Sequence, residues 1–245
     1  GYAQQFNFTV QREVRSNLMV ELAYMGNVGR KLGGTNVDIN VIPLVDGKGP
    51  AQQNQRARRF PQFSGLTWVS PVWGDSTYHA LNVKVEKRYA GGLNFLSVFT
   101  WSKFIDNVTE SELGGTPNVY QHMELHKFDR SISGNDIPMR WVSSGVYELP
   151  WGKGRRWGLT NPVANAVLGG WGVGAILELR DGPPWGAVEQ TNTTNAFSNS
   201  QRPNLLSNPV LDAGRSRGEI VARYFDTTAF AAPGTSNFGN AARNV

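Results

Sequence analysis

The chain of 245 residues is long enough for one or two ordinary domains, so length alone does not fix the fold. Its composition, with 28 Gly, 8 Trp and 12 Phe but no Cys, favours strands and turns and excludes disulfides and thiolate metal sites. The formal charge of +5 is too scattered to single out nucleic acid, and no apolar run reaches the length of a membrane-spanning helix.

Two alternating segments open the chain. Residues 5–14 place Phe6, Phe8 and Val10 on one face, with polar residues between them, and residues 18–28 continue the same pattern. Only three residues separate the two segments. This spacing predicts a β-hairpin.

Four further segments alternate in the same way, at residues 77–89, 93–105, 140–150 and 171–180. The first two are joined by a short Ala-Gly-Gly turn, and Lys87 interrupts the apolar face near that turn. All six segments have about the length of a tilted membrane-spanning strand, roughly 9 to 11 residues.

The connections between these segments alternate between short and long. Residues 29–76, 106–139 and those after 181 form long polar links, in which we expect little regular structure beyond a hairpin arm at 63–70. Outer-membrane barrels join their strands by short periplasmic turns and long extracellular loops. Because the links alternate between the two sides of the membrane, the link 151–170 should be periplasmic, although it is longer than a typical periplasmic turn. We therefore predict an all-β fold, an antiparallel transmembrane β-barrel segment of about six spanning strands with long extracellular loops.

Aromatic residues cluster at the two ends of the predicted strands. Rings at membrane interfaces keep their bodies in hydrocarbon and their polar edges at the headgroups. The alternative is a β-sandwich with these rings in its core. The outer set is Tyr24, Trp101 and Trp141, and the inner set is Tyr89, Trp151 and Trp171.

Charged residues supply two groups of candidate site residues. Arg56, Arg58 and Arg59 lie in the first long loop, where they are either contacts for an anionic ligand or for lipopolysaccharide phosphates, or merely solvated. The second group alternates with the apolar face and is expected to line the lumen, pairing across strands or with a plug. Its members are Glu21, Lys84, Glu86, Arg88, Glu148 and Arg180.

Three short motifs resemble catalytic or cofactor sites without matching their spacing. His122, Glu124 and His126 lack the order that sets two zinc ligands on one helical face, and we predict no helix there. Glycines 170, 172 and 174 lie in or beside a strand, and residues 152–156 lack the spacing of a phosphate-binding loop. We expect no enzyme, cofactor, metal site or nucleic-acid partner.

A series of phrases along nearly the whole chain resembles the C-terminal barrel of Oar-like TonB-dependent receptors, whose N-terminus carries a carboxypeptidase-regulatory-like domain. Their order is more specific than any one phrase. The phrases are "FNFTVQREV", "LMVELAYMGNVGRKL", "RRFPQFSGLTWV", "STYHALNVKVEKRYAGGLNFLSVFTWSKFID", "MRWVSSGVYELPWGKGRRW", "LGGWGVGAILELRDGPPW", "QRPNLL" and "YFDTTAFAAPGTSNFGNAARNV".

The resemblance implies a barrel of about 22 strands around a plug domain in the bacterial outer membrane. Residues 1–245 would be part of that barrel, and we recognise in them no signal peptide, plug, TonB-box or final strand. The implied function is import of a scarce ligand, such as a siderophore or oligosaccharide. The implied partners are outer-membrane lipid, lipopolysaccharide, the plug and the TonB complex. A secreted glycan-binding module, a passive porin and a structural outer-membrane protein are the alternatives.

Overall fold

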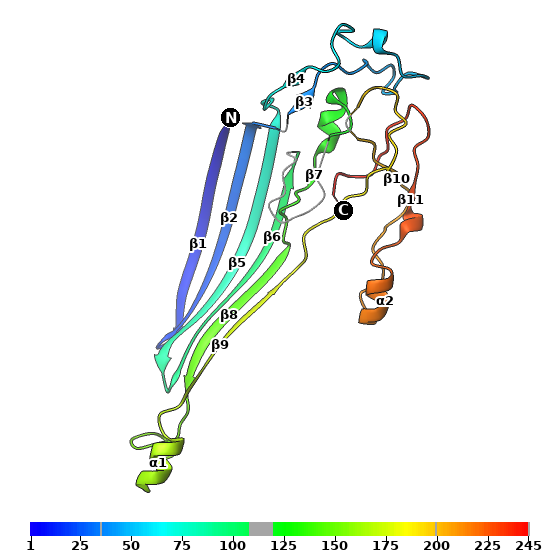
Figure 1. The fold of residues 1–245 in the computed structure, drawn as a ribbon. Helices are drawn as coiled ribbons and strands as arrows, with labels where there is room; N and C mark the ends of the chain where they lie inside the picture. The colour runs from blue at the N-terminus through cyan, green and yellow to red at the C-terminus, as the bar shows by residue number, and fades with distance from the viewer. Residues whose placement is uncertain (35, 108–119, 199, 245) are drawn as a thin grey trace.

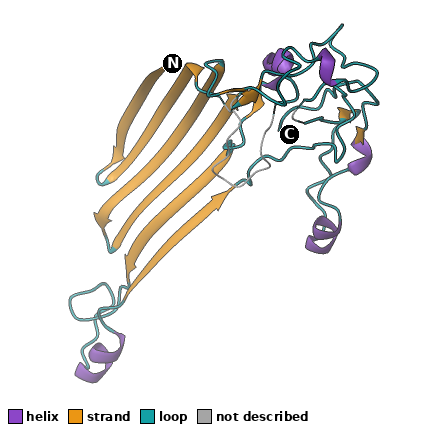
Figure 2. Cartoon of the chain, turned by 45° about the horizontal axis from the view of Figure 1, so that its top comes forward, coloured by secondary structure: helices purple, strands orange, loops and turns teal. Residues whose placement is uncertain are grey.

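The computed structural model describes residues 1–34, 36–107, 120–198 and 200–244. The chain forms one open antiparallel sheet with a layer of loops at one end (Figures 1 and 2). Six long strands follow one another in the order β1-β2-β5-β6-β8-β9, and the two-residue β7 pairs with β6 beside β8. The long strands are β1 (Tyr2–Arg15), β2 (Leu18–Leu32), β5 (Gly74–Ala90), β6 (Leu93–Asp106), β8 (Met139–Glu148) and β9 (Gly172–Arg180). The predicted all-β antiparallel fold is confirmed.

The strand register gives the sheet two different faces, because directly paired residues project to the same side. One row of pairs crosses all six strands and is entirely apolar. The row consists of Val10, Leu22, Val83, Phe99, Trp141 and Leu179. The adjacent row projects to the other side and consists of Gln11, Glu21, Lys84, Val98, Val142 and Glu178. We call these sides the apolar face and the polar face.

The aromatic rings predicted at the outer strand ends lie exposed on the apolar face. Tyr24, Trp101 and Trp141 retain 40%, 62% and 41% of their accessible surface. In a β-sandwich they would be covered by a second sheet, and among the described residues the only other sheets are two pairs of two-residue strands. The sandwich alternative is therefore wrong.

The strands are joined closely at the end that we call the inner end. Asn17 (φ 67°) makes the first turn, and Gly91 and Gly92 (φ 61° and 84°) make the second. A side chain at Gly92 would approach the carbonyl oxygen of Glu148 to 2.9 Å, so glycine is also needed for space. The third inner link holds the helix α1 (Pro162–Leu168), whose first turn is capped by Asn161. The unusual length of this link thus comes from a short helix that was not predicted.

The opposite, outer end carries the long links, which have more structure than the sequence indicates. Among the described residues, no helix is long and apolar enough to cross a membrane. The predicted hairpin arm at 63–70 is wrong: two of its residues, Thr67 and Trp68, pair instead with Asp38 and Val37. The elements of this end are β3 (Val37–Asp38), η1 (Gln55–Ala57), β4 (Thr67–Trp68), η2 (Met123–Asp129), β7 (Ser131–Ile132), β10 (Asn204–Leu205), α2 (Arg217–Ala222), η3 (Thr227–Ala229) and β11 (Phe230–Ala231).

Candidate functional site

The three long links meet in one ordered assembly, which we call the outer layer (residues 33–34, 36–73, 120–138, 181–198 and 200–244). The first and second links are joined where Tyr120 Oη accepts from the backbone N–H of Asp38 (2.9 Å). The first and third are joined where the N–H of Ile42 donates to the carbonyl of Ala196 (3.0 Å). The three links therefore stabilise one another rather than moving as separate loops.

Two buried ion pairs fix the outer layer, one between two of its links and one between the layer and the sheet. Arg202 Nη1 lies 2.8 Å from Asp129 Oδ1, with the two side chains 4% and 3% exposed. Arg243 bonds to Asp106 at the outer end of β6, and both side chains are buried. Burial raises the pKa of the Asp129 carboxyl, although the Arg202 guanidinium opposes this effect. Charges buried this deeply must be paired, so each pair fixes where its two segments meet.

Gln121 connects these segments further. Its side-chain oxygen accepts from the N–H of Arg202 (2.7 Å), and its side-chain nitrogen donates to the carbonyl of Gly239 (3.0 Å). The residue is 3% exposed. Both ends of its amide are thus satisfied between the second and third links, as a buried polar group requires.

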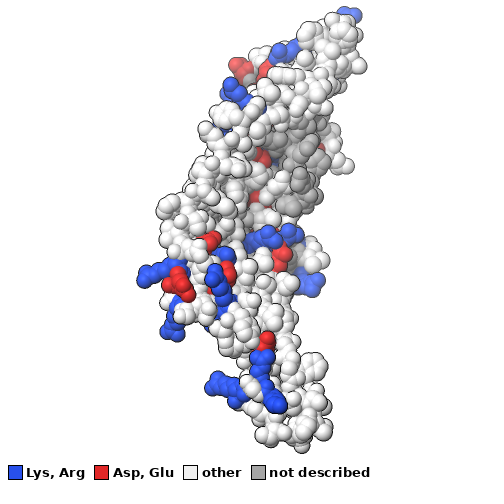
Figure 3. Space-filling model, turned by 90° about the vertical axis from the view of Figure 1, so that its left-hand side faces the viewer, with Lys and Arg blue, Asp and Glu red and all other residues white. Residues whose placement is uncertain are grey.

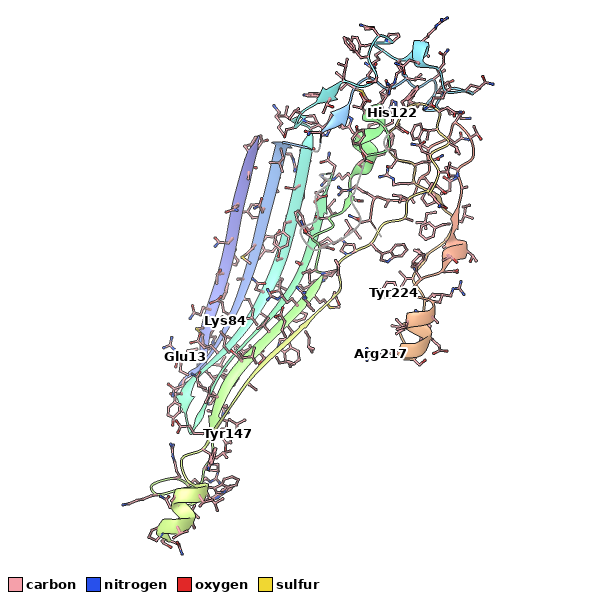
Figure 4. All side chains as sticks on the ribbon, viewed as in Figure 1. Glu13, Lys84, His122, Tyr147, Arg217 and Tyr224 are labelled. Carbon is pink, nitrogen blue, oxygen red and sulfur yellow. The ribbon has the colours of Figure 1, made fainter. Side chains whose placement is uncertain are left out.

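His122 is fully buried at the start of η2, within the outer layer (Figure 4). Its Nδ1 accepts from the N–H of Glu124 at 3.3 Å, and Nε2 lies 3.1 Å from the carbonyl of Ile42. Both contacts suit a neutral ring with its proton on Nε2. Burial lowers the pKa of His122, with a smaller contribution from Arg59, and it outweighs the opposing effects of the Ile42 carbonyl and Glu124.

Acidification should loosen the outer layer through His122. The unfolded imidazole titrates near 6.5 and the buried one below it, so the unfolded state takes up the proton first. The stability that depends on the neutral ring is complete above about pH 6.5 and is lost as the pH falls through and below that value. Hydrogen exchange of the η2 amides at pH 7.5 and 5.0, corrected for intrinsic rates, should show this loss. The variant H122Q should abolish the pH dependence and the control H126Q should keep it, and an unchanged dependence in H122Q would contradict the assignment.

The three predicted loop arginines have different surroundings. Arg58 is buried, lying 3.6 Å from the Asp38 carboxylate with its guanidinium 3.9 Å from the Phe197 ring centre. Arg59 forms an ion pair of 2.5 Å with Glu124 and is partly exposed, and Arg56 is exposed. Arg58 therefore belongs to the interior of the outer layer, and only Arg56 and Arg59 face solvent.

Three of the predicted lumen-lining residues come together on the polar face near the inner end. Lys84 Nζ lies 3.1 Å from Glu86 Oε2, and Arg88 Nε lies 3.6 Å from Glu86 Oε1. Glu21 is paired with Lys84 in the strand register. Figure 4 places Lys84 and Glu13 in this part of the sheet, and Figure 3 shows charges gathered toward the inner end and sparse along the middle.

The other two predicted lining residues are not part of that group. Glu148 bonds to the Tyr89 hydroxyl (2.7 Å) and forms an ion pair with Arg155 in the third inner link (2.5 Å). Arg180 is paired in register with Arg140, whose Nε lies 3.0 Å from Glu178 on β9. The sequence gives no signal for these partners, because they depend on the register between distant strands.

On β1, β2 and β5, uncharged groups that no sequence pattern marked line a hollow in the outer half of the polar face. A hollow of about 460 Å³ lies against β1, β2 and β5. Its amide side chains come from Gln5, Asn7 and Asn27, and Tyr78 lies beside them, packed edge-on against Phe104 at 5.8 Å. On these three strands the polar face thus changes from amides and a phenol at the outer end to charges at the inner end, whereas β8 and β9 carry Arg140, Glu178 and Arg180 at their outer ends.

The short motifs serve structural roles. The His126 ring stacks on Trp73 (4.4 Å, 11°), and His122 is bonded within the outer layer, so the two imidazoles have separate partners. Within the described ranges, no three His, Cys, Asp or Glu side chains gather as a metal site would require. Glycines 172 and 174 lie inside β9, and residues 152–156 form the turn before α1.

The comparisons with known proteins agree with the two-faced sheet. Neither the curated proteins nor the solved structures include a match to the chain. The model of one family, the outer membrane beta barrel domain, matches residues 1–245. The apolar face is then the lipid-facing side, because hydrocarbon accepts only a sheet whose exposed side chains are apolar. The chain therefore belongs to the outer membrane beta barrel domain family and has its place in the bacterial outer membrane.

Proposed function

We propose that this chain is the barrel wall and extracellular loop layer of an Oar-like TonB-dependent transporter that imports a scarce ligand. The observation that carries the proposal is the outer layer, whose three links are joined by hydrogen bonds and by the buried Arg202–Asp129 pair, and which the buried Arg243–Asp106 pair fixes to β6. A passive pore needs little more than an open passage. A layer with fixed shape presents a defined surface to a ligand outside the cell, which is what selective capture requires.

The polar face supports the same proposal. Its outer hollow offers amide groups and the Tyr78 ring, which suit the uncharged part of a ligand. Its inner part presents Lys84, Glu86 and Arg88, which we propose contact the plug of the full-length protein. Arg56 and Arg59, at the solvent side of the outer layer, are proposed as first contacts for an anionic group. We propose binding and transport rather than catalysis, with the TonB complex supplying energy through the plug.

A conductance measurement separates this proposal from a porin. The full-length parent protein, inserted into planar bilayers in KCl, should give no stable open-channel steps, because a plug fills the lumen. Persistent open steps in the intact protein would contradict the transporter proposal and favour a passive pore. A parent variant without the plug is the control and should conduct. A secreted glycan-binding module is not retained, since the family is an outer-membrane one.

A further inference from the structure

Two guanidinium groups converge on one hydroxyl at the outer end of the sheet. Arg130 Nη2 donates to Thr77 Oγ1 at 3.1 Å. Arg30 Nη1 lies 3.4 Å from the same oxygen and donates to the carbonyls of Gly29 and Ser76, both at 2.8 Å, which holds its guanidinium in place beside Thr77. Arg30 belongs to β2 and Thr77 to β5, whereas Arg130 lies between η2 and β7. The sheet and the outer layer therefore bring two cations together at a point that the sequence does not mark.

This cluster lies on the apolar face. Thr77 is paired with Val28 and Ile105, and it precedes Leu81 by four residues on the same strand. Leu81 is paired with Trp101, whose exposed ring belongs to the apolar face. Because alternate residues of a strand share a face, Thr77 projects toward lipid, and the two guanidinium groups meet it there.

The cluster has an excess of positive charge. Arg30 Nε lies 3.9 Å from the Asp75 carboxylate, and within the described part of the chain Arg130 has no carboxylate within 4.0 Å. Lys103, which projects to the same face from β6, lies 3.4 Å from Asp136. Three cations thus face two carboxylates. The Thr77 oxygen accepts from Arg130 and lies beside the Arg30 guanidinium, which leaves its O–H proton for a further acceptor.

Phosphate is the anion that this arrangement fits best. The planar fork of a guanidinium matches the spacing of two phosphate oxygens, and a hydroxyl adds a third donor. Arg30 and Arg130 are partly or fully exposed, so an oxyanion can approach both, at Arg30 through the nitrogens other than Nη1, which stays on the Gly29 and Ser76 carbonyls.

The surroundings favour a lipid over a free ion. On the membrane side of the cluster, Tyr24 Oη lies 2.8 Å from His79 Nδ1, and the two rings stack at 6.0 Å. A groove of about 610 Å³ runs beside them, and its lining includes Leu81, Trp101 and Lys103. Amphipathic rings mark the headgroup level, and an apolar groove next to it can receive an acyl chain.

We propose that Arg30, Thr77 and Arg130 bind a phosphate group of an outer-leaflet lipopolysaccharide, with one acyl chain in the adjacent groove. The long links define the outer end as extracellular, and that leaflet is the one the cluster faces. The proposal rests on the outer-membrane position of the chain and needs no assumption about transport.

The test measures lipid retained by the purified full-length parent in detergent. The probes are lipid A with both phosphates, the same lipid without phosphate, and inorganic phosphate alone, with bound lipid counted by native mass spectrometry. The double variant R30Q/R130Q should lower the affinity for phosphorylated lipid A by about tenfold or more, since it removes two charge-assisted contacts. T77V should give a smaller loss with the fold intact. The matched control is R12Q/K87Q, which removes two cations from the inner end of the same face.

Each outcome decides the proposal. A loss confined to R30Q/R130Q and T77V, seen only with the phosphorylated lipid, supports it. Equal binding of the phosphate-free lipid, equal losses in R12Q/K87Q, or binding of inorganic phosphate without retention of lipid would overturn it. Heat-dependent migration on gels verifies that every variant is folded. Because the assay does not measure uptake, its failure is distinct from failure of the transporter proposal.

Discussion

Replacement of Asp129 by Ala should destabilise the outer layer by about 3–5 kcal/mol, because it leaves the Arg202 guanidinium buried without its carboxylate. The two side chains are 3% and 4% exposed, so water cannot take the place of the lost partner. Nε of Arg202 already lacks a hydrogen-bond partner among the described residues, which leaves the guanidinium with little other compensation. Hydrogen exchange of residues 120–138 and 200–206 in the membrane-inserted parent should report the loss.

Two comparison variants show whether the effect arises from an unpaired buried charge. D129L/R202M removes both charges and should recover most of the stability lost in D129A. R140Q breaks the exposed Arg140–Glu178 pair, whose side chains are 51% and 44% exposed, and should change stability by about 1 kcal/mol or less. If D129A were no more destabilising than R140Q, the outer layer would not depend on its buried ion pair.

Arginine at position 83 should lower the stability of the membrane-inserted barrel by about 2–4 kcal/mol, since it places a charge on the lipid-facing side near the bilayer midplane. Val83 lies near the middle of β5 and is paired with Leu22 and Phe99 in the apolar row. Reversible unfolding of the parent in phospholipid bilayers by guanidinium chloride gives the difference in free energy.

The matched control is V142R, the same substitution on the polar face. Val142 is paired with Val98 and with Glu178, so an arginine there meets a wet surface and a carboxylate. We expect a change below about 1 kcal/mol, as for a solvent-exposed charge pair. Equal losses in V83R and V142R would show that the two faces do not differ in their contact with lipid.

The sequence predicted the strands because the alternating pattern that marks each strand lies within its own short segment. Alternation in residues 5–14 and 18–28 identified β1 and β2, and the short link between them identified the hairpin. The predicted second strand ended at residue 28, whereas β2 extends to Leu32, since pairing with β5 continues through a register shift after Gly29. The short helix α1 went unpredicted because the glycines that end it argued against any helix there.

The outer layer depends on contacts between residues that are far apart in the sequence. Arg58 looked like an exposed loop cation, yet it lies inside the outer layer with Asp38 and Phe197. Thr67–Trp68 looked like part of a self-contained arm, yet it pairs with a segment about thirty residues earlier. Such contacts cannot be predicted from hydrophobic periodicity, because the side chains of irregular links do not alternate regularly between two faces.

The sequence by itself determined that the chain forms antiparallel strands with one apolar face, because a period of two places alternate residues on opposite sides wherever the strand lies. The tertiary structure alone decided that His122, Asp129 and Arg202 are buried in one layer and that Arg30 and Arg130 meet at Thr77. Those contacts join residues from separate links and strands. A charge can be buried or held in place only where a partner meets it, and these partners meet only when the chain folds.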